Sequence, residues 1–386
     1  MIINSNLGVY IHIPFCRRKC NYCDFYLITN TNLINDYIKY LKEEIKKYSE
    51  IYHDSIVDSI FYGGGTPSIL SDFQIYDLQN TLYKYFRVSD KSENTIESNP
   101  EDFLFAKEKF INLKENKINR ISFGVQSFNN DTLKFLTRLH TANDAIKVIE
   151  EASKVFDNIS IDMIYEVPGE SNLDLVKSIK QAITLDIQHI SAYSLIFEEN
   201  TRLYTLYEQN KITKTISDEK VDQYYLIYDM LTDSGFRQYE VSNYSLKNFE
   251  SRHNKKYWNY ENYIGLGASS HSFFYPERWN NYRNIIKYID SLKRGNFPFD
   301  EKHKLSKQEM LEEIIFLGLR SEGVNLNKFS DIIGQSFIEL FSDAIKILIS
   351  TGFANITNER FTLNQNGKIL ADEIMLKYFS MTDLKE

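Results

Sequence analysis

The strongest constraint on the fold is a repeated alternation of short β-rich segments and longer helical ones over the first 200 residues. Runs of β-branched and aromatic residues predict six strands, Val9–Ile13, Ser55–Tyr62, Asn94–Ser98, Arg120–Val125, Ile159–Tyr165 and His189–Ile196. Between the first two strands, apolar residues recur every three or four positions and predict an amphipathic helix. Strands that alternate with helices indicate a parallel sheet covered by helices. Six units are too few for a closed barrel of eight, so we expect an open (β/α)6 partial barrel of the α/β class.

Polar residues or glycines stand at the end of each predicted strand. They are His12 with Pro14, Gly63–Gly65, Glu97 with Asn99, Gln126, Asp162 with Glu166, and Ser194. Barrel folds place their chemistry at the carboxyl ends of the strands. Six such ends on one sheet therefore predict a single shared site above it.

The composition is that of a globular protein and excludes several classes of function. The chain has 386 residues, of which 42% are hydrophobic and 25% charged, with a net charge of −8. This charge argues against a basic surface for nucleic acid. No apolar run is long enough to span a membrane, and the first residues lack the cationic region of a secretory signal. We therefore predict a cytoplasmic protein without a nucleic-acid partner.

The pattern divides the chain into a core (1–250), an aromatic connecting segment (251–300) and a C-terminal module (301–386). Residues 205–250 are expected to be mostly helical with a break at Gly235, and residues 251–283 to be irregular. The module is expected to contain helices, a hairpin and a last helix: Lys307–Arg320, Ser336–Ser350, Ala354–Ile356 with Arg360–Leu363, and Gly367–Tyr378. Helices with a β-wing are typical of a winged-helix module. Because it carries 10 Lys and Arg against 13 Asp and Glu, we predict a structural or protein-facing role.

All three cysteines of the chain, Cys16, Cys20 and Cys23, lie within eight residues. An odd number at this spacing in a cytoplasmic chain indicates metal ligation rather than disulfides. Thiolates suit zinc or an iron–sulfur cluster. Zinc would need a fourth ligand, for which His12 is the candidate. In a cubane cluster, three thiolates leave one iron open for a further ligand.

The segment CRRKCNYC resembles the CxxxCxxC signature of the radical S-adenosylmethionine (SAM) superfamily. Its surroundings, YIHIPFC, resemble the oxygen-independent coproporphyrinogen III oxidase-like group within that superfamily. The resemblance implies a radical SAM (β/α)6 partial TIM barrel with a C-terminal helical, winged-helix-like module. It also implies a [4Fe–4S] cluster on the three cysteines, with SAM chelating the fourth iron.

The same resemblance assigns a set of SAM-binding residues near the strand ends. They are Tyr10, Tyr22, Gly64, Gly65, Thr66, Glu97, Gln126, Arg138 and Asp162. Glycines let a backbone approach a ligand closely. Carboxylates and amides suit ribose hydroxyls, and a guanidinium suits the SAM carboxylate. Each polar residue taken alone would also fit an ordinary solvated strand end.

Residues 253–282 contain nine aromatic side chains, including both tryptophans, Trp258 and Trp279. His253 and His271 lie in the same stretch, together with several arginines and lysines. Aromatic walls, imidazole and cations suit a planar, dianionic, iron-bearing ligand. The composition equally suits an aromatic cluster packed beneath a loop.

The sequence HNKKYW in this stretch resembles the HNxxYW motif, which marks a branch of the group formed by HemW-like heme chaperones. The resemblance implies heme as a ligand. His253 would be the axial ligand, Asn254 would orient it, and Tyr257 and Trp258 would wall the site.

Two functions follow from the resemblance. The first is a heme chaperone that binds heme and transfers it to acceptor proteins without turnover, respiratory proteins at the membrane periphery among them. The alternative is an oxygen-independent coproporphyrinogen III dehydrogenase, supplied by a flavodoxin- or ferredoxin-type electron donor that reduces the cluster. Phe25 replaces the fourth cysteine of the oxidase, and only nine residues precede Tyr10, where the oxidase carries an extension. Both departures favour the chaperone.

Overall fold

The computed structural model describes residues 6–104 and 106–380. Its centre is a run of six parallel strands that lie side by side in chain order. These strands are β1 Asn6–Ile13, β2 Ile56–Gly64, β3 Arg87–Ser98, β4 Arg120–Gln126, β5 Ile159–Tyr165 and β6 His189–Ser194. The predicted (β/α)6 arrangement is confirmed, and each strand overlaps its predicted segment.

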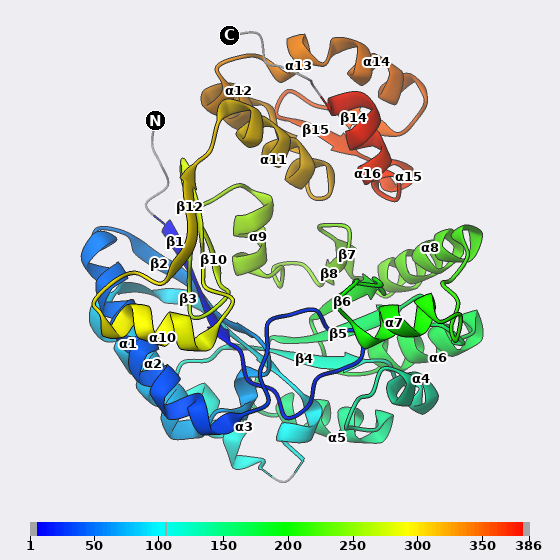
Figure 1. Cartoon of the computed structure of the whole chain (residues 1–386). Helices are drawn as coiled ribbons and strands as arrows, with labels where there is room; N and C mark the ends of the chain where they lie inside the picture. The colour runs from blue at the N-terminus through cyan, green and yellow to red at the C-terminus, as the bar shows by residue number, and fades with distance from the viewer. Residues whose placement is uncertain (1–5, 105, 381–386) are drawn as a thin grey trace.

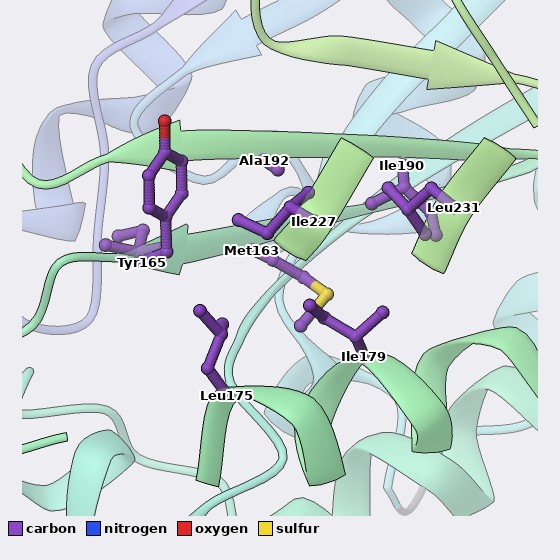
Figure 2. Close-up of a pocket in the computed structure, with 9 residues that line it drawn as sticks. Met163, Tyr165, Leu175, Ile179, Ile190, Ala192, Ile227 and Leu231 are labelled. Atoms are coloured by element: carbon purple, nitrogen blue, oxygen red, sulfur yellow. The ribbon is translucent and has the colours of Figure 1, made fainter. Parts of the chain in front are cut away.

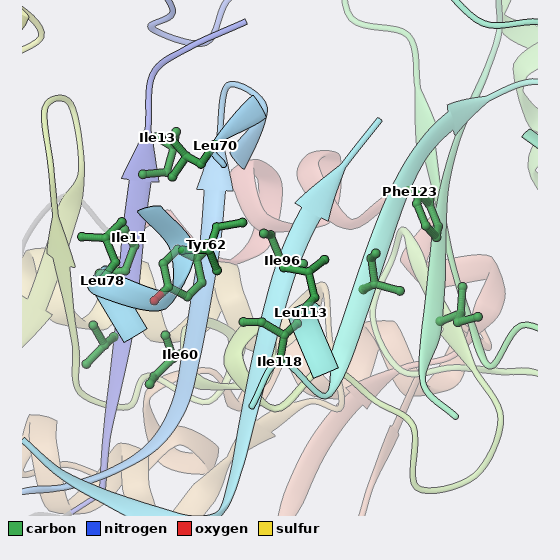
Figure 3. Close-up of a cluster of buried hydrophobic side chains, with 14 of the residues drawn as sticks. Ile11, Ile13, Ile60, Tyr62, Leu70, Leu78, Ile96, Leu113, Ile118 and Phe123 are labelled. Atoms are coloured by element: carbon green, nitrogen blue, oxygen red, sulfur yellow. The ribbon is translucent and has the colours of Figure 1, made fainter. Parts of the chain in front are cut away.

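Helices cover the outer face of this sheet (Figure 1). They are α1 Ile34–Ile51, α2 Asp72–Tyr85, α3 Glu108–Glu115, α4 Asn130–Phe135, α5 Ala142–Ala152 and α6 Asn172–Ile183, with short 3₁₀ turns η1 Thr31–Leu33, η2 Pro67–Ile69 and η3 Pro100–Asp102. Figure 3 shows the apolar side chains packed between strands and helices, among them Ile11, Tyr62 and Leu78. Because side chains alternate along a strand, Tyr10 and His12 point to the opposite, inner face.

Residues 205–250 are less helical than predicted. They contain most of α7 (Arg202–Glu208) and α8 (Ser217–Asp233), followed by β7 (Arg237–Gln238) and β8 (Asn243–Ser245). β8 pairs antiparallel with β6 and lengthens the sheet. Gly235, with φ +90°, ends the helical stretch as predicted.

The prediction that residues 251–283 are irregular is wrong. This part folds into α9 Arg252–Trp258, β9 Tyr263–Leu266, β10 His271–Phe274 and β11 Glu277–Asn281, and continues into α10 Ile285–Lys293 and β12 Phe299–Lys304. β9 pairs parallel with β1, so the full sheet has the order β12-β11-β10-β9-β1-β2-β3-β4-β5-β6-β8-β7. The aromatic segment therefore forms one edge of the sheet.

A buried carboxyl fixes this edge to the first helix. Glu44 of α1 accepts hydrogen bonds from the Gly267 backbone N–H at 2.7 Å, the Tyr288 hydroxyl at 2.6 Å and the Asn281 amide at 2.7 Å. Burial raises the pKa of Glu44 to about 7. One side chain thus joins α1 to the segments around β9, β11 and α10.

The C-terminal module combines short helices with a three-stranded sheet. Its elements are α11 Lys307–Leu319, β13 Val324–Asn325, α12 Leu326–Ile333, α13 Phe337–Leu340, α14 Ser342–Ser350, β14 Ala354–Ile356, β15 Arg360–Leu363, α15 Gln365–Lys368, α16 Ala371–Ile374 and the π-helix η4 Met375–Phe379. The predicted hairpin is confirmed. The two later predicted helices are each broken into shorter pieces.

The module and the aromatic segment share one apolar core. Tyr260, Tyr263 and Phe273 of that segment pack with the module's buried residues rather than with the barrel core. The Arg278–Glu313 ion pair, at 2.7 Å, crosses the same boundary. The module therefore lies against the sheet edge at β9–β12, as Figure 1 shows.

A small apolar gap lies between β5, β6, α6 and α8 (Figure 2). Its volume is about 10 Å³, about enough for one water molecule.

Among residues 6–104 and 106–380, no helix combines the length and apolar character needed to cross a membrane.

Candidate functional site

The three cysteines lie in a loop that leaves the carboxyl end of β1. The loop closes on itself, because the Cys16 backbone N–H donates to the Ile28 carbonyl at 3.1 Å. Cys16 is buried, whereas Cys20 and Cys23 are partly exposed. Burial raises the pKa of the Cys16 thiol to about 11. Loading with iron would therefore displace the thiol proton.

A continuous chain of polar contacts joins two of the cysteines. Cys16 Sγ lies 3.2 Å from Thr66 Oγ1, which accepts from the Asn99 amide at 3.0 Å. Asn99 Oδ1 accepts from Arg138 Nη2 at 2.6 Å, and Arg138 Nη1 points at Cys20 Sγ at 3.6 Å. The ends of β2 and β3 and the segment after α4 thus place donors beside the loop, and donors to sulfur are what tunes an iron–sulfur cluster.

The zinc alternative does not fit this geometry. His12, its proposed fourth ligand, has Nδ1 3.0 Å from the Tyr10 hydroxyl and Nε2 3.2 Å from the Tyr26 carbonyl. Among the described residues, no three Cys, His, Asp or Glu side chains converge where one metal ion could sit. A cubane cluster needs no such convergence, because each thiolate binds its own iron. The donor set therefore fits a cluster better than a single ion.

The predicted glycine motif forms the turn after β2, where the chain passes close to β1. Gly64 has φ +108°, and its N–H donates to Glu97 Oε2 at 3.0 Å. A Cβ on Gly64 would lie 2.4 Å from the His12 ring, and one on Gly65 would lie 2.7 Å from the Phe15 carbonyl oxygen. Only glycine fits at both positions.

Inside the barrel, beneath the cysteine loop, lies a cavity of about 170 Å³. Its walls come from the inner faces of β1–β6 and from α9: Tyr10, Phe61, Glu97, Arg120, Ser122, Asp162, Ser191, Tyr193, Asn254 and Tyr257. Three predicted SAM residues therefore meet here, Tyr10, Glu97 and Asp162. The cavity also holds two predicted heme residues, Asn254 and Tyr257.

Charges in this cavity are buried and interact strongly. Burial, and then Asp162, raise the pKa of Glu97 to about 8. Burial also raises the pKa of Asp162, whose Oδ1 accepts from the Ser122 hydroxyl at 3.3 Å. The Arg120 guanidinium lies near both carboxyls and opposes these increases. Burial and the charge of Glu97 raise the pKa of Tyr10.

The other predicted SAM residues lie above the cavity. Gln126 ends β4 with φ +68°, and its amide lies above Gly124. Arg138 also donates to the Gly124 carbonyl at 2.8 Å. Tyr22, in the cysteine loop, packs against an apolar cluster that includes Leu136.

The HNxxYW motif lies on α9, underneath the barrel, and its histidine is fully buried. His253 Nδ1 lies 3.0 Å from Ser59 Oγ, and Nε2 lies 2.8 Å from the Tyr257 hydroxyl. Its ring stacks on Phe61 with centroids 5.3 Å apart. Burial lowers the pKa of His253 to about 3. Iron ligation by His253 would require the ring to leave one of its two partners, so that role stays a prediction.

The other residues of the HNxxYW motif lie partly at the cavity and partly outside it. Asn254 and Tyr257 face the cavity, whereas Trp258 is half-buried and takes no part in the cavity wall. Trp279 packs elsewhere, because its Nε1–H donates to the Tyr48 hydroxyl at 2.7 Å in the barrel core. The aromatic enrichment of this segment thus includes core packing as well as site residues.

Sequence reasoning missed part of the site. Asn99 was expected only as a polar strand end, and it bridges Thr66 and Arg138. Four residues that line the cavity were not predicted: Arg120, Ser122, Ser191 and Tyr193. The alternation of side chains along the β-strands could have identified the four cavity residues. Arg120 and Ser122 in β4 share a face with each other, as do Ser191 and Tyr193 in β6, and polar residues on one face of an otherwise apolar strand indicate a polar barrel interior.

Comparison with known proteins agrees with this geometry. Residues 10–182 match the Radical SAM superfamily, and residues 305–370 match the HemN C-terminal domain. The heme chaperone HemW of Bacillus subtilis is 35% identical over 95% of this chain and 97% of its own length, and that of Lactococcus lactis is 35% identical over 96% and 97%. The solved structure of coproporphyrinogen III oxidase (HemN) from Escherichia coli has a TM-score of 0.82 at 20% identity, covering 96% of this chain and 89% of that one, which shows a common fold.

The resemblance to the radical SAM superfamily is therefore confirmed, together with the partial-barrel fold. Relatives at 35% identity along nearly the whole length distinguish the chaperone branch from the oxidase. The chain belongs to the HemW family of heme chaperones within the radical SAM superfamily.

Proposed function

We propose that this protein binds heme and transfers it to acceptor proteins, while holding a [4Fe–4S] cluster and SAM. The observation that carries the proposal is the similarity to HemW chaperones over 95% of the chain, with the HNKKYW motif placed against the barrel cavity. The acceptors include respiratory proteins at the membrane periphery, and the transfer takes place in the cytoplasm.

In this proposal Cys16, Cys20 and Cys23 hold the cluster, which supplies an open iron for SAM. In this proposal SAM is held by residues of the cysteine loop, the strand ends and the cavity: Tyr10, Tyr22, Gly64, Gly65, Thr66, Glu97, Gln126, Arg138 and Asp162. The Arg138 guanidinium suits the SAM carboxylate, because it is already held beside the loop. Protonated Glu97, with its pKa near 8, would add a neutral donor and acceptor for ribose hydroxyls at pH 7.

The oxidase is the second candidate, because its fold is shared over 96% of this chain. It would take coproporphyrinogen III as substrate and need an external electron donor. Phe25 stands where the oxidase has its fourth cysteine. This difference, together with the HemW relatives, favours heme carriage without turnover.

The test is anaerobic purification with the cluster intact, followed by titration with heme and with coproporphyrinogen III. We expect about four irons per chain, one heme bound per chain, and transfer of that heme to an apo-acceptor protein. Multiple turnovers of coproporphyrinogen III with SAM and a reductant would instead establish the oxidase. A protein that binds no heme would contradict the proposal.

A further inference from the structure

All seven histidines of the chain lie among the described residues, and six of them have partners. Their ring nitrogens contact carbonyl, hydroxyl or carboxylate oxygens: His12 with Tyr10 and Tyr26, His53 with Glu50 and Asp54, His140 with Glu101 and Val125, His189 with Ser160 and Tyr239, His253 with Ser59 and Tyr257, and His303 with Glu309. For His271, by contrast, the described part of the chain offers neither ring nitrogen a hydrogen-bond or ion-pair partner, and its side chain is exposed.

His271 lies on the inner face of the sheet, next to Gly265, which has no side chain. In the register of β1 and β9, Tyr10 stands beside Gly265. β10 pairs antiparallel with β9 at Phe273 and Tyr263, so Gly265 and His271, each two residues along from that pair, lie opposite each other. Paired residues of adjacent strands point to the same face. His271 therefore faces the same side as Tyr10, and its charge reaches His12.

Two arginines lie close to this imidazole. Both Arg278 and Arg283 act on the titration of His271 through their charge. The guanidinium of Arg278 is engaged with Glu313 and the Tyr263 hydroxyl. Arg283, which follows β11, donates to the Asp24 carbonyl at 2.6 Å and lies 3.6 Å from the Asp24 carboxylate, so it joins this edge to the cysteine loop. Its side chain is 56% exposed, against 26% for Arg278, so an anionic ligand can reach Arg283 more easily by displacing Asp24.

An apolar side chain lies exposed between two anchored residues of the cysteine loop. Phe25 is 68% exposed. Its neighbours are held, Asp24 by Arg283 and Tyr26 by His12, whose Nε2 lies 3.2 Å from the Tyr26 carbonyl oxygen. Phe25 is therefore held beside the contact between Asp24 and Arg283, with its ring exposed to solvent.

We infer that His271 supplies the iron ligand for heme at the mouth of the barrel, with Arg283 meeting a propionate and Phe25 packing against the macrocycle. This inference rests on the proposed function, which it deepens by placing the cargo beside the cluster loop. Exposed imidazole, guanidinium and an aromatic ring are the three groups that heme requires. Partial burial, together with Arg278 and Arg283, lowers the pKa of His271, which keeps the imidazole neutral for ligation at pH 7.

His253, the buried alternative to His271, is less suited to bind the heme iron. Both nitrogens of His253 have partners, its side chain has no exposed surface, and the adjacent cavity holds about 170 Å³. Ligand pockets for drug-sized molecules, which are smaller than heme, start at roughly 300 Å³. Binding at His253 would thus need the floor of the barrel to open, whereas the His271 side chain is already exposed.

The experiment titrates hemin, oxidised and reduced, into cluster-loaded protein under anaerobic conditions and records absorption spectra and affinity. We expect His271→Ala to lose the ligand-bound spectrum and to bind at least about tenfold more weakly. His271→Met should bind with a shifted spectrum and a raised heme reduction potential, because thioether replaces imidazole. His303→Ala, which alters another exposed histidine of the same sheet, is the matched control and should bind as the unaltered protein does.

The outcomes separate the inference from the proposed function. If unaltered protein binds no heme, the proposed function fails. If it binds heme, and His271→Ala keeps the same spectrum and affinity, the inference is overturned while heme carriage stands. Loss of the spectrum in His253→Gln, a variant that retains hydrogen-bonding groups, with His271→Ala unaffected, would assign the ligand to His253. Iron content and circular dichroism establish that each variant is folded and loaded.

Discussion

At the scale of single residues, the site depends on side chains that hold one another as much as on those that face a ligand. Arg138 is the clearest case, because its guanidinium reaches Asn99, the Gly124 carbonyl and Cys20 at once. A planar fork can join three partners in fixed directions, whereas an ammonium acts as a point charge. Arginine is therefore required here for its shape.

Replacing Arg138 by lysine should leave the three thiols able to hold iron but disorganise the SAM site. We expect near-normal iron content and an affinity for SAM reduced by about tenfold or more. Equilibrium dialysis with labelled SAM measures this effect. Arg18→Lys is the matched control, since Arg18 is an exposed arginine of the cysteine loop itself. Equal SAM binding by both variants would contradict the role given to Arg138.

A second prediction at the residue scale is that Gly64→Ala destabilises the fold. Alanine at Gly64 would combine a backbone conformation of φ +108° with a Cβ 2.4 Å from the His12 ring. We expect a loss of about 3 kcal/mol or more in the free energy of unfolding, measured by urea denaturation. Gly169→Ala is the control, because Gly169 has φ +86° but open space around it, and it should cost only about 1–2 kcal/mol. Similar losses at both positions would mean that the contact with His12 is unimportant.

At the scale of elements, the barrel strands could be predicted, whereas the sheet edge at β9–β12 could not. The barrel strands are apolar runs separated by amphipathic helices, and that periodicity is visible in sequence. β9, β10 and β11 have four or five residues, with aromatic side chains on both faces, so no period-two alternation marks them. The pairing of β9 with β1 joins residues more than 250 positions apart, which local patterns do not encode.

Glu44 gives the element-scale prediction, because it joins α1 to the sheet edge and titrates near pH 7 when folded. Its folded pKa lies above its ordinary value, so the folded chain binds more protons, and stability falls as pH rises from about 4.5 to 7. The difference in pKa corresponds to about 3 kcal/mol. Glu44→Gln should remove this share of the pH dependence, measured as urea midpoints between pH 5 and pH 8. Parallel pH profiles for both proteins would contradict it.

At the scale of the whole molecule, the sequence predicts which residues form the site better than it predicts how deeply they are buried. The cysteine loop, the glycine turn and Glu97, Arg138 and Asp162 come together as the family motif implies. The burial of His253 could not be foreseen, because HNKKYW is a polar sequence. Its Lys256 is buried beside Asp58, a contact that only the fold creates.

The core shared by the module and the sheet edge predicts that a buried residue at their boundary contributes strongly to stability. Phe273 is 1% exposed and lies 4.4 Å from Tyr260 between ring centroids, at the boundary of the two parts. Phe273→Ala should cost about 3–5 kcal/mol in the free energy of unfolding. Phe73→Ala, at a position 73% exposed, should cost almost nothing and serves as the control. An unchanged urea midpoint for Phe273→Ala would show that the boundary contributes little.

The parallel pairing of β1 with β9 also affects how the chain is made. During synthesis, the outer edge of the first strand emerges early, yet its partner is complete only when Leu266 has left the ribosome. For most of translation, the nascent barrel therefore exposes unpaired backbone groups that other chains can pair with. The edge of β1 is protected from such pairing only once β9 has docked against it.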